Sequence, residues 1–228
     1  MKSPELVRVM ISLAFLSLMM GCASSAVQGK RTFTSGETMS RPSRVLVYDF
    51  RSDLPQVKAD DRREQQELFH ESRDALAEQL VSRLRSMGFM ARRVGHDIKP
   101  NPNEIMVEGR FVSIDKGNRF TRNVIGFGIG STEMVAQVQV LRARADNPNK
   151  QLLFDFRAVS KGSKKPGIIL PVGMGAQAVA VASGAVGVVG EVKGPVTQDA
   201  IRMADAIADD LGLFFVKQGW VSQEALEK

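Results

Sequence analysis

The chain has 228 residues, a formal net charge of +6 and a single cysteine. This length is enough for one domain with a full hydrophobic core. A single cysteine excludes an intramolecular disulfide, so that core must hold without covalent cross-links. The mild excess of positive charge suits anionic neighbours such as phospholipid head groups, lipopolysaccharide phosphates or acidic cell-wall polymers.

The first residues have the pattern of an exported lipoprotein. Lys2 precedes an apolar run that carries only one charge, Arg8, and this run has the length of a secretory h-region. Gly21 and Cys22 then resemble the cleavage site of a bacterial lipobox, in which the cysteine becomes the lipidated N-terminus. We predict a lipoprotein signal peptide over residues 1–21, cleavage between Gly21 and Cys22, and lipidation of Cys22. The alternatives are an ordinary signal peptide and an uncleaved anchor.

The residue after the cysteine indicates the destination. Ala23 is not an aspartate, and in lipoprotein sorting that resembles the enterobacterial rule this favours the outer membrane. The expected location is therefore the bacterial cell envelope, in the inner leaflet of the outer membrane facing the periplasm. The lipid on Cys22 would be the membrane anchor. Export also disfavours nucleic acid as a partner.

Composition divides the rest of the chain into a tether, a domain and a tail. Residues 22–43 are rich in Ser, Thr, Gly and charge and have little periodicity, which predicts a flexible tether. A single α/β domain is predicted over residues 44–222. It opens with a β-branched and aromatic run over 44–50 that is typical of a buried strand. Residues 223–228 would be a short tail.

Hydrophobic periodicity predicts one long helix over 61–87, with Gly88 as its C′ residue. A second helix opens at 195–197 with Thr197 as a candidate N-cap, and Gly219 ends it. Further strands are expected over 89–94, 104–115, 134–145 and 151–160, the last three as an antiparallel meander. This order predicts a two-layer α/β sandwich, in which a mixed β-sheet carries two long helices on one face.

A glycine-rich stretch lies between the third and fourth strands. Gly126, Gly128 and Gly130 alternate there, but the pattern does not predict a nucleotide site because a strand follows it instead of a helix. A twisted connection is the simpler interpretation. Basic and aromatic residues in this stretch, and the lysines around residue 161, are a candidate surface for an anionic or protein partner. The members of this surface are Arg119, Phe120, Arg122, Phe127, Lys161, Lys164 and Lys165.

Residues 167–190 form a second unusual stretch, apolar, glycine-rich and without charge. Three interpretations stay open. The stretch is a buried segment packed on the sheet, an apolar loop that docks on a partner or membrane surface, or a true span or pore segment with small residues at helix contacts.

The chain resembles two groups of known proteins. The start Val45-Leu46-Val47-Tyr48-Asp49-Phe50 and the long helix after it are distantly similar to periplasmic lipoprotein domains of the curli-secretion, Tol-associated and penicillin-binding-protein-activator type. The run Gly117-Asn118-Arg119 through Arg122, Gly126-Phe127-Gly128 and Gly130 resembles an uncharacterised bacterial lipoprotein family, numbered forty-four-ten among domains of unknown function. The likeness covers roughly residues 44–220. It implies the fold and an envelope location, and it implies no catalytic residue.

Catalytic residues have little support in the sequence. His70 and His96 are the only histidines, no serine stands in a nucleophile elbow, and no cluster has the spacing of metal ligands. We therefore expect a protein that is not an enzyme and that uses no cofactor or metal. The leading hypothesis is an envelope lipoprotein that acts as a tethered scaffold or assembly module with a protein partner. The alternatives are a self-associating lipoprotein with 167–190 inserted in the membrane as part of a secretion-type pore, and a binder of anionic envelope polymer.

Overall fold

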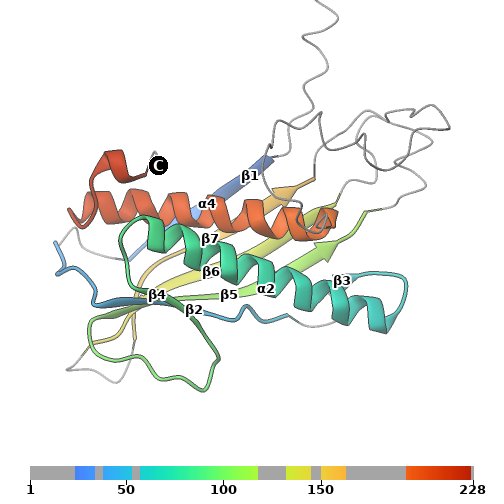
Figure 1. Cartoon of the computed structure of the whole chain (residues 1–228), viewed down its shortest axis with the longest axis horizontal. Coiled ribbons are helices and arrows are strands. Elements are labelled where there is room, and N and C mark those ends of the chain that lie inside the picture. Colours follow the sequence, from blue (N-terminus) through green and yellow to red (C-terminus); the bar gives the residue numbers. More distant parts are fainter. Residues whose placement is uncertain are drawn as a thin grey trace, which may run out of the picture. The chain divides into compact units, whose positions relative to one another are not determined.

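Seven strands and two long helices make up the described part of the chain (Figure 1). The computed structural model describes residues 24–33, 38–52, 57–117, 132–144, 150–162 and 194–226. The strands are β1 (Ser24–Thr32), β2 (Arg44–Tyr48), β3 (Val57–Lys58), β4 (Ala91–Val94), β5 (Glu104–Asp115), β6 (Glu133–Arg142) and β7 (Gln151–Lys161). The helices are α2 (Arg62–Ser86) and α4 (Pro195–Lys217), followed by the short 3₁₀ turn η3 (Gln223–Ala225).

The strands form one mixed sheet in the order β1-β7-β6-β5-β2-β4, with β3 beside β5. β2 runs parallel to both β4 and β5, whereas β5, β6, β7 and β1 are successively antiparallel. Both helices lie on the same face of the sheet, here called the helix face (Figure 1). The predicted mixed sheet with two helices on one face is therefore confirmed, as is the antiparallel meander.

The main core lies between the helices and the helix face. Leu76, Leu80 and Leu84 of α2 are fully buried against the sheet, at helical spacings of four. Each such leucine contributes about 2 kcal/mol through burial. A smaller cluster lies on the opposite face of the sheet, here called the second face. It contains Leu46, Tyr48, Val94, Met106 and Ala143. β2 is thus buried on both faces, as its continuous apolar run predicts.

The boundaries of α2 follow from local chemistry. Asp61 is the N-cap and accepts a hydrogen bond of 2.9 Å from the backbone N–H of Glu64, while the carboxylate of Glu64 accepts one of 2.8 Å from the N–H of Asp60. The first bond satisfies a donor that the first helical turn leaves free, and the second fixes the backbone just before the N-cap. At the other end Gly88 has φ of 82°, which confirms the predicted C′ glycine.

Two expectations from the sequence are wrong in detail. Residues 24–32, which composition assigns to a flexible tether, form the edge strand β1, because main-chain pairing with β7 needs no alternating apolar pattern. The N-cap of α4 is Gly194 and not Thr197, since Pro195 begins the helix and no side chain caps it. The two-residue strand β3 has no signal of its own in the sequence. Among the described residues, no helix is long and apolar enough to cross a membrane.

Candidate functional site

The carboxyl ends of β2 and β4 lie side by side, and the chain leaves them toward opposite faces of the sheet. After β2 it leads to α2 on the helix face (Figure 1). After β4 it crosses the second face, where the hydroxyl of Tyr48 donates a hydrogen bond of 2.8 Å to the carbonyl of Ile98. In open α/β sheets, ligand sites form where neighbouring strands send their connections to opposite faces. A functional site is therefore expected first at this point of the sheet.

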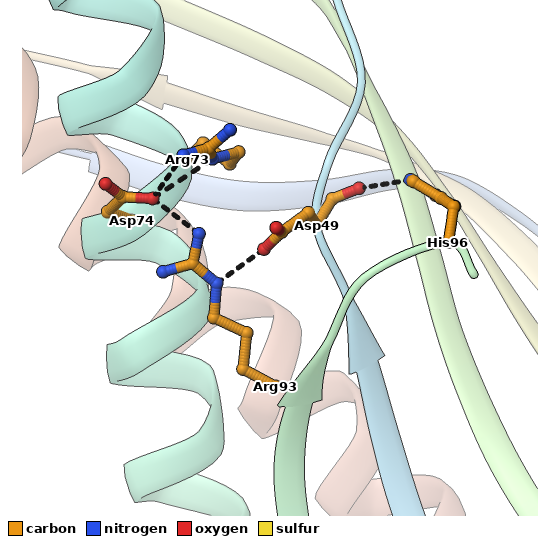
Figure 2. A network of polar contacts seen from close by, with 5 residues as sticks. All are labelled: Asp49, Arg73, Asp74, Arg93 and His96. Carbon is orange, nitrogen blue, oxygen red and sulfur yellow. Dashed lines mark hydrogen bonds and ion pairs between the residues drawn. The ribbon is translucent and has the colours of Figure 1, made fainter. Parts of the chain in front are cut away.

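A chain of alternating charges occupies this point (Figure 2). Arg93 of β4 donates from Nε to the carboxylate of Asp49 and from Nη2 to that of Asp74 on α2, each at 2.5 Å. Arg73 donates to the same oxygen of Asp74 at 2.9 and 3.0 Å. Two carboxylates and two guanidinium groups thus neutralise one another and connect the end of β2, the strand β4 and the helix α2.

The network also shifts the pKa values of two of its members, Asp74 and Arg93. Burial alone raises the pKa of Asp74, but hydrogen bonds from Arg93 and Arg73 outweigh burial and hold this pKa below its ordinary value. Burial lowers the pKa of Arg93, yet its bonds to Asp49 and Asp74 give a net increase. Both shifts favour the charged form, so the ion pair between Asp74 and Arg93 persists at neutral pH.

His96 lies at the outer end of the network, on the turn after β4 (Figure 2). Its Nε2 lies 2.8 Å from the carbonyl oxygen of Asp49 and 3.1 Å from Nε of Arg51. The first contact needs a proton on Nε2 and the second needs a free lone pair there, so each uses a different tautomer. The ring of His96 stacks on Tyr48 with centroids 5.6 Å apart.

This arrangement holds β2, β4 and α2 in position relative to one another. Within the described part of the chain, His96 contacts an arginine, a backbone carbonyl and a tyrosine ring, so no hydroxyl or thiol nucleophile stands in hydrogen-bond reach of it there. Over the described ranges, no group of three or more His, Cys, Asp or Glu side chains could hold a metal ion.

A second polar cluster is buried where β6, β7 and α4 meet. Asp199 of α4 is fully buried and accepts hydrogen bonds from the hydroxyls of Thr132 and Ser160, the latter at 3.1 Å, and from Arg202. Ser160 also lies 3.2 Å from the hydroxyl of Ser25 on β1. The sequence pattern assigns no such role to Asp199, because Thr132 and Ser160 are distant from it in the chain.

The same end of the sheet collects the ends of several described segments. Ser24 of β1 lies opposite Lys161 of β7, Lys161 lies opposite Glu133 of β6, and Glu133 lies opposite Asp115 of β5. These four residues are called the strand-end row. The described segments that flank residues 118–131 and 163–193 therefore meet beside this row.

Of the predicted interaction surface, only Lys161 belongs to the described part of the chain. Its ammonium group lies 3.6 Å from the carboxylate of Glu133, and both side chains are about half exposed. The other predicted sites lie outside the described residues: Gly21, Cys22, Arg119, Phe120, Arg122, Phe127, Lys164, Lys165 and the stretch 167–190.

Comparisons with known proteins give a family and a distant likeness of fold. No curated protein sequence matches the chain. The PelC dodecamer from Paraburkholderia phytofirmans is similar with a TM-score of 0.40 and 10% identity, over 79% of this chain and 96% of that one. A single-substitution variant of that dodecamer has a TM-score of 0.38 and 10% identity, over 81% and 95%. The family described as "Domain of unknown function (DUF4410)" matches residues 45–179, more than half of the chain, and the protein belongs to this family.

Proposed function

We propose that the protein is a non-enzymatic, lipid-anchored module of the bacterial envelope, which holds one end of its sheet at the membrane surface and serves as a scaffold for assembly there. The observation that carries the proposal is the register of β1. Ser24 belongs to the strand-end row, opposite Lys161, and Cys22 precedes Ser24 by two residues.

This register makes the link to the membrane short. Two extended residues span about 7 Å, so lipidation of Cys22 would bring the strand-end row to the head groups. A tether of the length expected from composition would instead leave the domain free to turn. The sheet would therefore stand end-on at the membrane surface. If sorting follows Ala23, the lipid would lie in the inner leaflet of the outer membrane.

A scaffold fits the chemistry of the described residues better than an enzyme does. The charged groups at the ends of β2 and β4 neutralise one another and bind α2 to the sheet. The carboxylate of Asp199 is likewise engaged, with two hydroxyls and one arginine. Both clusters fix the positions of elements, which is what a module that presents surfaces to a partner requires.

A second candidate function is self-association with residues 167–190 inserted in the membrane, as in a secretion-type pore. One observation favours it. Gly162 and Gly194, the described residues on either side of this stretch, both lie by the strand-end row. The N–H of Gly162 donates to the carbonyl of Thr132 at 2.9 Å, and Gly194 is the N-cap of the helix that carries Asp199. The stretch would then leave and re-enter the domain at the membrane.

The anchor is tested by the mass of the mature N-terminal peptide, where we expect diacylglycerol and an acyl chain on Cys22. A version with an ordinary cleaved signal peptide in place of residues 1–22 should leave the membrane fraction and stay folded. An unmodified Cys22, or persistent membrane binding of that version, would contradict a lipid anchor.

Orientation is tested with a single introduced thiol, since Cys22 is the only cysteine and would be blocked by lipid. A fluorophore on Glu133→Cys reports the strand-end row, and one on Met90→Cys, which is exposed before β4, reports the opposite end. β6 alone separates these ends by roughly 30 Å. We expect nitroxide-labelled head groups to quench the first fluorophore and spare the second. Equal quenching would contradict the end-on arrangement.

A stable oligomer in detergent that is lost on deletion of 167–190 would favour the second function.

A further inference from the structure

A row of long polar side chains crosses the second face of the sheet. Strand register aligns Arg51 with Arg110 of β5, Arg110 with Gln137 of β6, Gln137 with Arg157 of β7, and Arg157 with Gln28 of β1. Residues paired across neighbouring strands share a face of the sheet. The next residues along β6 and β7, Ala136 and Ala158, belong to the main core on the helix face, so these five side chains stand on the second face. They are called the basic row.

The basic row is exposed and largely without partners. Its three arginines and Gln28 are exposed, and Gln137 is half-buried. The side chains of Arg110, Gln137, Arg157 and Gln28 make no hydrogen bond or ion pair with another residue in the part of the chain that the structure describes. Arg51 uses one nitrogen, Nε, for His96, and the rest of its guanidinium group has no partner among the described residues.

No nearby carboxylate among the described residues compensates these charges. The adjacent row of the same face contains Glu108 and Asp155, and each already has a cation of its own. Lys150 pairs with Glu108, and Arg31 holds Asp155 with two hydrogen bonds of 2.9 and 2.5 Å. The guanidinium groups of the basic row are thus a local excess of positive charge on this face of the sheet.

We propose that the basic row binds a linear anionic glycan, whose carboxylates pair with the arginines and whose hydroxyls bond to the glutamines. A guanidinium group matches a carboxylate with two parallel hydrogen bonds, and an amide both donates to and accepts from a hydroxyl. Strands are about 4.8 Å apart, so a row across five of them extends for about 19 Å in a straight line. A polymer that repeats its charge along an extended chain suits this line better than a compact anion does.

The position of the row on the sheet favours a polymer over lipid head groups. Gln28 is four residues from Ser24, so the basic row lies about 13 Å from the strand-end row along the strands. It runs across a face of the sheet and not along its end. This preference for a polymer over lipid rests on the proposed end-on orientation. The charge of the row and its strand register are independent of that orientation.

The test measures binding of oligogalacturonate, an anionic glycan of defined length, to the full-length lipidated protein in phosphatidylcholine nanodiscs. A neutral glucan oligomer of the same length is the comparison ligand. The variant Arg110→Gln/Arg157→Gln removes two charges of the row. The matched control Arg62→Gln/Lys217→Gln removes two exposed charges from the helices, which lie on the other side of the sheet.

We expect the wild type and the control to bind the oligogalacturonate with an affinity that falls as salt is added, and to bind the neutral glucan at least tenfold more weakly. The row variant should lose about tenfold or more in affinity and much of its salt dependence. Gln137→Ala should weaken binding while the salt dependence stays.

Three results would overturn the proposal. In the first, the row variant binds as tightly as the helix control. In the second, the neutral glucan binds as well as the acidic one. In the third, phosphatidylglycerol in the nanodisc abolishes glycan binding by the wild type, which would assign the row to the membrane. Fluorophore quenching at residue 133 is measured on the same nanodiscs, so failure of the end-on orientation is distinguished from failure of glycan binding.

Discussion

Arg31 on the edge strand β1 holds the buried carboxylate of Asp155 on β7 with two hydrogen bonds, of 2.9 and 2.5 Å. Only 5% of the Asp155 side chain is exposed, whereas 70% of Arg31 is. The hydrogen bond to Asp155 also raises the pKa of Arg31. A carboxylate buried in this way needs a cation beside it, and β1 provides that cation. The pair therefore adds a side-chain contact to the main-chain pairing that keeps this polar, glycine-containing segment on the sheet.

The first prediction concerns this pair. Arg31→Met should leave Asp155 without its cation and loosen β1, so that amides of residues 24–32 exchange with deuterium faster while those of β6 keep their protection. Arg31→Lys, which restores the charge without the bidentate geometry, should give an intermediate rate. Unchanged exchange over 24–32 in Arg31→Met would show that main-chain pairing alone holds the strand.

The second prediction concerns the network at the ends of β2 and β4. Arg93→Met should lower the free energy of unfolding by about 1–3 kcal/mol, because it leaves Asp49 and Asp74 without their shared donor. The neighbouring Arg92→Met is the matched control: Arg92 is exposed and points to the other face, so its loss should cost less than about 0.5 kcal/mol. Urea denaturation measures both. Equal effects of the two variants would remove the structural role of the network.

The third prediction is a pH dependence that arises from Asp74. Its pKa is lower in the folded protein than in the unfolded chain, because the bonds from Arg93 and Arg73 outweigh burial. Such a group adds stability above the unfolded pKa of about 3.9, and this contribution is lost as pH falls through the lower folded pKa. Asp74→Asn should therefore be less stable than the wild type at pH 7 and should converge with it in acid.

The size of this difference is limited, since 42% of the Asp74 side chain is exposed and solvent screens its ion pairs. We expect less than about 1 kcal/mol at pH 7. Glu71→Gln is the control, because it removes an exposed carboxylate of the same helix that lies outside this network. If the wild type and Asp74→Asn differed by a constant amount from pH 7 to acid, the cause would lie outside the titration of Asp74.

How much of this structure can be predicted from sequence depends on whether the signal is local. The helix α2 is predictable from its leucine spacing and its caps, and β5 from its alternation, because each pattern lies within one segment. β1 is not, since Ser24–Thr32 is mostly exposed and its pairing with β7 involves residues more than a hundred positions away. Strands of this kind are defined by their neighbours and not by their own side chains.

The polar sites follow the same rule. In the sequence Asp199 is an acidic residue near the start of a helix. In the structure it accepts hydrogen bonds from Thr132, which directly precedes β6, and from Ser160 on β7. The basic row is likewise visible only once strand register is known, because Arg110 and Arg157 lie on β5 and β7, with β6 between these two strands. The lysines between Lys161 and Lys165, by contrast, lie within one short segment, so this charge cluster can be recognised from the sequence alone.

The last prediction concerns the hydrogen bonds of Asp199, which attach α4 to the sheet beside the strand-end row. Thr132→Val keeps the size of the side chain but removes a donor to a fully buried carboxylate, which should lower the free energy of unfolding by about 1–3 kcal/mol. Thr132→Ser keeps the hydroxyl and should recover most of that loss. Gly162→Ala should also destabilise, because a Cβ there would lie 2.3 Å from the hydroxyl oxygen of Thr132. In Thr132→Val a methyl group takes the place of that hydroxyl, so the Cβ added at residue 162 would still clash. The double variant Thr132→Val/Gly162→Ala should therefore be no more stable than Gly162→Ala alone. Thermal and urea unfolding of the four variants measures these differences, and a Thr132→Val protein as stable as the wild type would show that Ser160 and Arg202 satisfy Asp199 by themselves.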